Sequence, residues 1–423
     1  MKAIEKRFLL PFVLVTSMFM LWGLANNMTD TLLAAFRKIM QMSDTQTSFI
    51  QMAFYGAYFC IALPAALFIR KYSYKSGVVM GLVLYAAGAI LFLPAAWAES
   101  YAFYLIAIYI MASGCSVLET ASNPYIMSMG SPETATRRLN IAQSFNPLGS
   151  IMGILISKYF ILQDISLYSV SGTYTALGIV LLAIMVIMLF ANMPEGKSSE
   201  PTTINYKLST INSIRRLYHN RLYRWGVVAQ FFYVGAQIGA WSFTIRLVMK
   251  ELGHVEAEAA TIYLASIIGF CASRFVYTWL MKYIAPGKLL AAGATLSAIS
   301  SLVVVLSSGW TAVVALMLVS IFMSLMFPTI YGIALCDVEN SAKGGHEGDA
   351  KIGASGLIMA ILGGAIITPI MGWLVDSSTL SALVQAATPE EAAIRSAFYL
   401  PVLCFAIVLA YALAFRHTSD VEA

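Results

Sequence analysis

The sequence predicts an all-α polytopic membrane protein with twelve transmembrane helices, divided into two six-helix halves. Three observations lead to this fold class. The composition is too apolar for a globule in water, the apolar residues fall in twelve runs long enough to cross a bilayer, and one long polar segment separates the sixth run from the seventh.

The composition indicates which solvent surrounds the chain. Of its 423 residues, 59% are hydrophobic and 11% are charged, with a mean hydropathy of +0.77. Soluble domains carry roughly 25% charged residues, so most of this surface must face lipid. The net charge of +5 comes from short clusters of Lys and Arg between apolar runs. Such clusters are typical of membrane topology signals, and no nucleic-acid partner is expected.

The apolar runs give the expected spans, because a helix needs about 20 apolar residues to cross a bilayer. The first run is too long for the core of a signal peptide and is therefore expected to be a span. The twelve predicted spans are 8–36, 47–69, 77–97, 101–129, 138–162, 171–192, 224–249, 257–281, 288–308, 311–336, 351–375 and 393–415.

Alternate connections between the spans carry most of the Lys and Arg, as at 70–75, 137–138 and 282–288. The positive-inside rule therefore predicts that both termini lie in the cytoplasm. The long polar segment is read as a linker whose end, Ile211 to Tyr223, has helical character. The predicted domains are an N-terminal half (1–192), a cytoplasmic linker (193–223) and a C-terminal half (224–423).

The two halves show weak internal symmetry. Spans four and ten each carry a proline near the inner end, Pro124 and Pro328, and spans five and eleven are both rich in small residues. Parallel six-span repeats are typical of the major facilitator fold, in which the substrate binds between the halves near the membrane midplane.

Two carboxyl groups, Asp30 and Glu119, lie inside predicted spans and away from the span ends. A charged carboxyl at the centre of a span costs about 2.5–3.5 kcal/mol on insertion scales. It must face a water-filled cavity, pair with another group or carry a proton. We therefore predict that both residues couple transport to protons, with structural pairing as the alternative.

Amide and aromatic side chains surround these carboxyls in the sequence. Many donors and acceptors beside aromatic faces suit a sugar, whose hydroxyls donate and accept while its C–H face stacks on a ring. The alternatives are interhelical hydrogen bonds for the amides and core packing for the aromatics. Arg274, the one base well away from the ends of its span, is expected to snorkel or to pair with a loop carboxylate. The predicted substrate contacts are Asn26, Asn27, Glu119, Asn123, Asn140, Gln143, Asn146, Gln237, Trp241 and Tyr55.

Several motifs in order along nearly the whole chain resemble the L-fucose permease family of proton symporters, a branch of the major facilitator superfamily. They are Leu21–Asp30 (LWGLANNMTD), Leu118–Tyr125 (LETASNPY), Arg138–Asn146 (RLNIAQSFN), Tyr233–Gln237 (YVGAQ) and Met326–Gly332 (MFPTIYG). The polar insert at 344–349 departs from the family pattern.

The resemblance implies secondary active, proton-coupled uptake of L-fucose or a related hexose by alternating access. It implies that Asp30 and Glu119 titrate, and that Gln143 and the neighbouring asparagines contact sugar. It further implies a functional monomer in the bilayer of a bacterial inner membrane, with H⁺ as coupling ion and no cofactor.

Two alternatives stay open. The carrier could be sodium-coupled, or selective for glucose, galactose or N-acetylglucosamine. A membrane-embedded transferase is a more distant alternative, because the four histidines are scattered and no nucleophile–base pattern is present. The five cysteines have no metal-ligand spacing, so neither catalytic nor metal-binding residues are expected.

Overall fold

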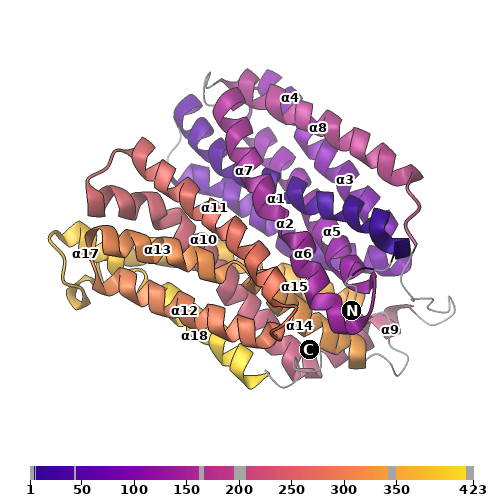
Figure 1. The fold of residues 1–423 in the computed structure, drawn as a ribbon. Coiled ribbons are helices and arrows are strands. Elements are labelled where there is room, and N and C mark those ends of the chain that lie inside the picture. The colour runs from indigo at the N-terminus through magenta and orange to yellow at the C-terminus, as the bar shows by residue number, and fades with distance from the viewer. Residues whose placement is uncertain are drawn as a thin grey trace. The chain divides into compact units, whose positions relative to one another are not determined.

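The computed structural model describes residues 4, 6–41, 44–161, 166–194, 206–341 and 349–415. Throughout these residues the regular structure is helical, which confirms the predicted all-α class (Figure 1). Every predicted span coincides with one helix or with two consecutive helices. In this part of the chain, nine helical segments, some of them made of two consecutive helices, are long and apolar enough to cross a membrane.

Contacts divide the chain into two units, which we describe separately. Unit 1 comprises Met1–Asn220 and Val338–Met359, and unit 2 comprises Arg221–Asp337 and Ala360–Ala423. The first nine α-helices are α1 (Leu9–Ile39), α2 (Asp44–Lys71), α3 (Tyr74–Ile90), α4 (Phe92–Trp97), α5 (Tyr101–Ser128), α6 (Ala135–Gln143), α7 (Asn146–Ile156), α8 (Leu167–Phe190) and α9 (Tyr206–His219). The remaining α-helices are α10 (Arg221–Leu252), α11 (Glu256–Leu280), α12 (Pro286–Leu306), α13 (Gly309–Met323), α14 (Met326–Ser341), α15 (Asp349–Met359), α16 (Leu362–Ser377), α17 (Pro389–Ser396) and α18 (Tyr399–Ala414).

Several spans consist of two helices with a short break between them. The fifth span breaks at Ser144 and Phe145, between α6 and α7, and Pro147 stands in the first turn of α7. Proline has no N–H to continue the hydrogen-bond ladder, so it favours a fresh helix start.

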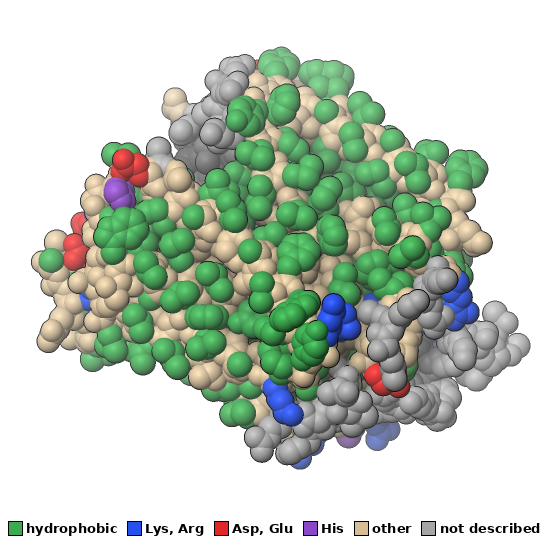
Figure 2. Space-filling model, viewed as in Figure 1, with side chains coloured by type: hydrophobic (Ala, Val, Ile, Leu, Met, Phe, Trp, Pro, Cys, Tyr) green, Lys and Arg blue, Asp and Glu red, His purple; other side chains and the backbone are tan. Residues whose placement is uncertain are grey.

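The outer faces of the helices are apolar. In α8, Ile179, Ile187 and Phe190 are exposed, the last to 86%. Hydrophobic side chains cover much of the visible surface in Figure 2, whereas Lys and Arg occupy a few places. Apolar exposure on this scale is unfavourable in water and matches a lipid environment, as the composition predicts.

The same helix pairs recur in each unit. In unit 1, α1 packs on α7 and α3 packs on α5 and α8. In unit 2, α10 packs on α16 and α12 packs on α13 and α18. Spans one and five of the first half thus pair as spans seven and eleven do in the second, which is the pattern that duplication predicts.

Glycine makes the pairing of α1 with α7, and that of α10 with α16, possible. A Cβ atom at Gly149 of α7 would lie 1.8 Å from the carbonyl oxygen of Met20 in α1. At Gly363 of α16 it would lie 2.0 Å from the carbonyl oxygen of Phe231 in α10. Small residues let membrane helices approach this closely, and any side chain here would separate the two backbones.

The linker helix α9 is held in unit 1 by a polar network. Arg216 donates from Nε and Nη2 to the two carboxylate oxygens of Asp349, both at 2.6 Å. The buried hydroxyl of Ser213 accepts from Arg216 at 3.1 Å and from Arg70 at the end of α2 at 3.3 Å. Asp349 is the last residue of the polar insert and the first of α15, while positions 344–348 lie outside the described residues.

All five cysteines are free. Cys115, Cys271, Cys336 and Cys404 are buried, whereas Cys60 is exposed on α2. Four thiols are therefore shielded by packing.

Candidate functional site

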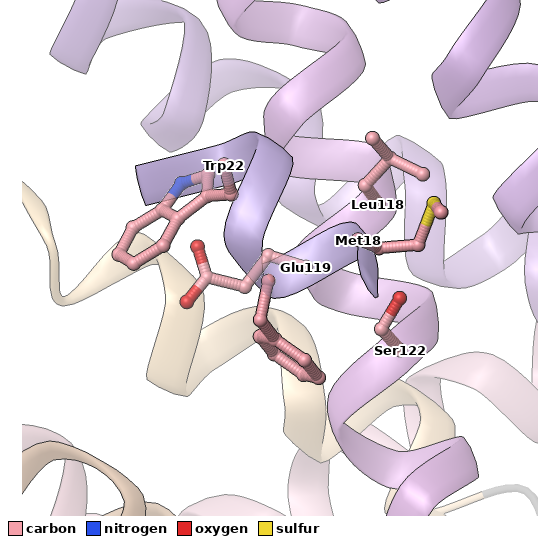
Figure 3. A pocket seen from close by; sticks show the side chains of 6 residues that line it. Met18, Trp22, Leu118, Glu119 and Ser122 are labelled. Carbon is pink, nitrogen blue, oxygen red and sulfur yellow. The ribbon is translucent and has the colours of Figure 1, made fainter. Parts of the chain in front are cut away.

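A small pocket in unit 1 lies between α1 and α5. Most of its wall is apolar, and Glu119 and Ser122 supply the polar side chains. Figure 3 shows the Glu119 carboxylate directed toward the indole of Trp22, with Ser122 on the same helix as Glu119. The pocket is lined by Met18, Phe19, Trp22, Leu118, Glu119 and Ser122.

Glu119 is the residue that gives this pocket its chemistry. Its side chain is only 3% exposed, and neither carboxylate oxygen has a well-formed hydrogen bond in the described part of the chain. The Asn123 side chain, one turn further along α5, is a polar neighbour that interacts with it. A buried carboxylate without such bonds is unfavourable when charged, so this group is suited to holding a proton or meeting a polar ligand.

Gln143 and Asn123 form a buried amide pair next to Glu119. Gln143 donates from Nε2 to the Oδ1 of Asn123 at 3.0 Å, which joins α6 to α5. Because its Oδ1 accepts from Gln143, the Asn123 side chain faces Glu119 with its Nδ2 group. Glu119, Asn123 and Gln143 are thus brought together, as the sequence predicts.

Other predicted amides bond to backbone carbonyls. Asn140 donates to Thr136 at 2.9 Å in its own helix, and Asn27 donates to Gly23 at 3.3 Å in α1. Asn146 donates to the carbonyl of Phe19 at 3.2 Å and so links α7 to α1. The Asn146 bond matches the interhelical alternative raised above, whereas the other two bonds lie within one helix. The predicted sugar contacts of the three residues stay predictions.

The remaining predicted residues are spread over both units. Tyr55 of α2 is buried, and its ring contacts that of Phe54 edge-on. In unit 2, Gln237 is half-buried on α10, and Trp241 donates from Nε1 to Ser320 at 3.2 Å. The side chains of Asn26 and Asp30 lie outside the described residues.

Five of the six lining residues escape the sequence reasoning, among them Trp22 and Ser122. Trp22 precedes Asn26 by four residues and Asp30 by eight, so one helix face carries all three. Ser122 follows Glu119 by three residues, and its buried hydroxyl has no partner in the described structure. The helical spacing of Trp22 from Asp30, and of Ser122 from Glu119, is the signal that could have identified these two residues.

The expectation that Arg274 snorkels is wrong. Its side chain is 3% exposed, and Nε donates to the carbonyl of Ser324 at 2.6 Å. Ser324 lies at the break between α13 and α14, where the helical ladder leaves carbonyl groups without intrahelical partners. The guanidinium also lies 4.6 Å from the ring centre of Phe270. A buried acceptor therefore holds this side chain inside unit 2.

Comparison with known proteins identifies the family. The model of the Major Facilitator Superfamily matches residues 9–344. The chain belongs to this superfamily. As a member of a transporter superfamily, the protein is a multi-pass membrane transporter and not an enzyme, as predicted.

Among its relatives within the superfamily is an L-fucose-proton symporter of Haemophilus influenzae, 39% identical, with 97% of each chain covered. The L-fucose-proton symporter of Escherichia coli is 34% identical over 96% of this chain and 93% of its own. A glucose/galactose transporter of Brucella abortus is 31% identical over 97% and 95%. These relatives confirm the resemblance to the L-fucose permease family.

The fold of this superfamily member also matches solved structures. A crystal structure of the transporter FucP in the outward conformation superposes with a TM-score of 0.83 at 33% identity, covering 96% of this chain and 99% of the other. The proton:xylose symporter XylE matches with a TM-score of 0.72 at 11% identity, which supports the fold alone. Both matches agree with the predicted twelve-helix arrangement.

Proposed function

We propose that this protein is a proton-coupled sugar symporter that takes up L-fucose or a closely related hexose by alternating access. The observation that carries the proposal is Glu119, a buried carboxylate without a well-formed hydrogen bond in a pocket beside an indole ring. The pocket combines a site for a proton with an aromatic face for a sugar ring. The near-full-length relatives named for L-fucose and proton symport support the same function.

The mechanism follows from the cost of burying charge. On the outer side Asp30 takes up a proton, and the sugar binds near the membrane midplane. Neutral carboxyls are less costly to occlude than charged ones, so the loaded carrier closes outside and opens inside. The sugar leaves, the proton follows, and the empty carrier returns. One proton moving down 100 mV supplies about 2.3 kcal/mol, enough for roughly a 50-fold sugar gradient.

The setting is part of the proposal. We place the carrier in a bacterial inner membrane as a functional monomer, with both termini in the cytoplasm, H⁺ as coupling ion and no cofactor. Residues 1–192 and 224–423 are the two moving halves, and 193–223 is the linker. The substrate contacts are those predicted above, together with Trp22 and Ser122.

The first test is a pH recording. De-energised cells expressing the protein are suspended in weak buffer and receive L-fucose, galactose, glucose and N-acetylglucosamine in turn. We expect prompt alkalinisation with L-fucose, because symported protons leave the medium. Uptake that requires sodium without alkalinisation would contradict proton coupling.

A second candidate substrate is glucose or galactose, which the name of the Brucella abortus relative favours. Alkalinisation with one of these sugars and none with L-fucose would select it. In either case Asp30→Asn should abolish accumulation against a gradient. If this variant still accumulated sugar against a gradient, the proposed role of Asp30 in proton coupling would be contradicted.

A further inference from the structure

Three helices of unit 1 meet at Tyr58, a fully buried residue of α2. Its hydroxyl oxygen accepts a hydrogen bond from the indole Nε1–H of Trp22 in α1. The thiol of Cys115 in α5 is a neighbour of the same phenol. Ser116, the next residue of α5, donates to the backbone carbonyl of Tyr58 at 3.4 Å. Tyr58 is thus fixed at both its backbone and its ring.

The ring of Tyr58 is also held by packing. It lies 5.4 Å from the ring of Phe54, with the two planes inclined by 34°. A side chain held on several sides is a rigid acceptor for a neighbouring donor. The indole N–H can only donate, so its direction is set by the acceptor that it finds. Here that acceptor is Tyr58, and the half-buried Trp22 lines the pocket that contains Glu119.

We propose that Tyr58 is a positioning residue for sugar binding, which acts by holding the indole of Trp22 in place as a wall of the Glu119 pocket. Tyr58 acts through Trp22, and its ring does not line the pocket. This inference rests on the proposed function. A pre-oriented aromatic face avoids an ordering penalty when the ligand binds, so loss of the bond weakens sugar binding more than it slows turnover.

The test compares two buried tyrosines. In Tyr58→Phe the bond to the indole is lost, and KM for sugar uptake should rise about 2- to 10-fold, the equivalent of one hydrogen bond, with the saturating rate close to wild type. The control is Tyr85→Phe. Tyr85 is equally buried and donates to the backbone carbonyl of Leu21 at 3.1 Å. This bond also reaches α1, but it does not involve the indole of Trp22. Tyr85→Phe should leave KM unchanged.

A double-mutant cycle separates positioning from general loosening. In the Trp22→Phe background, adding Tyr58→Phe should cause no further rise in KM, because the group that Tyr58 orients is gone. Equal, additive effects of Tyr58→Phe in both backgrounds would overturn the proposal.

A second measurement does not depend on transport. In full-length protein labelled with ¹⁵N-tryptophan, the indole N–H signal of Trp22 is the one missing in Trp22→Phe. It should shift upfield in Tyr58→Phe and stay in place in Tyr85→Phe. An unmoved signal in Tyr58→Phe would overturn the positioning contact. Absence of sugar-dependent alkalinisation in wild-type cells would instead overturn the proposed function.

Discussion

Among single residues, Glu119 sets the energetic problem that the carrier has to solve. The carboxylate lies in a pocket with an apolar wall, so its charge is tolerated only while water, a proton or a ligand compensates it. A residue in this position links the state of the pocket to the proton gradient. The titration and the shape of the Glu119 side chain contribute separately to transport. Replacing the carboxyl with an amide of the same shape distinguishes the two contributions.

Glu119→Gln keeps the shape of the side chain and removes its titration. We expect the steady-state accumulation ratio of labelled sugar to fall by up to about 50-fold at 100 mV, because the proton no longer drives uptake. Exchange of labelled for unlabelled sugar, which needs no net proton movement, should continue. The control is Glu99→Gln, which changes an exposed carboxyl in the same way. Accumulation at the wild-type level in Glu119→Gln would contradict the assigned role.

The sequence reveals Glu119 because a carboxyl inside an apolar run is anomalous. Asn140, Gln143 and Asn146 are spaced by three residues along one predicted span, and this spacing does not reveal a helix break between them. The break at Ser144 and Phe145 places Asn146 on a different helix, where it bonds to α1. A helix break is a three-dimensional property that spacing along one span cannot show.

Among the helices, the tightest approach joins α1 to α7 at Gly149. Apolar runs predict where such helices begin and end, because length and hydropathy suffice for that. They do not predict which helices touch, since apolar residues face lipid and protein alike. At the α1–α7 contact, the residue that permits the close approach is a glycine, which has no side chain.

Gly149→Ala should destabilise this pair. The added methyl group would lie 1.8 Å from the carbonyl oxygen of Met20, so the backbones must separate. Overpacking of this kind costs about 1–3 kcal/mol. Gly172→Ala in α8 is the matched control, because a Cβ there meets nothing within 4 Å. Thermal unfolding of the purified protein should show a lower midpoint for Gly149→Ala only. Equal midpoints for both variants would contradict the packing argument.

Across the whole molecule, the chain folds back on itself over long sequence separations. Arg216 of the linker helix and Asp349 of α15 are 133 residues apart and form a two-fold hydrogen-bonded pair in unit 1. The sequence marks the linker by its composition and its helical end. It contains no signal that pairs a basic linker residue with this particular carboxylate, because many other charges have equivalent local surroundings.

Reversing one charge tests whether this pair stabilises the molecule. Arg216→Asp and Asp349→Arg should each lower the free energy of unfolding by about 1.5–3 kcal/mol, the range for hydrogen bonds to charged groups. Combining them exchanges the charges and should recover part of the loss. Arg215→Asp changes the neighbouring exposed residue and controls for net charge. Purely additive losses in the double variant would rule out a direct interaction.

The distribution of thiols also determines how this carrier can be followed at work. Four cysteines are packed away, and Cys60 is exposed on α2, a helix long and apolar enough to cross a membrane, where a water-soluble reagent has little access. Water-soluble maleimides should therefore react sparingly with the native protein. A cysteine introduced into an exposed polar loop would then be labelled selectively, so spectroscopic probes can be attached without first removing the natural thiols.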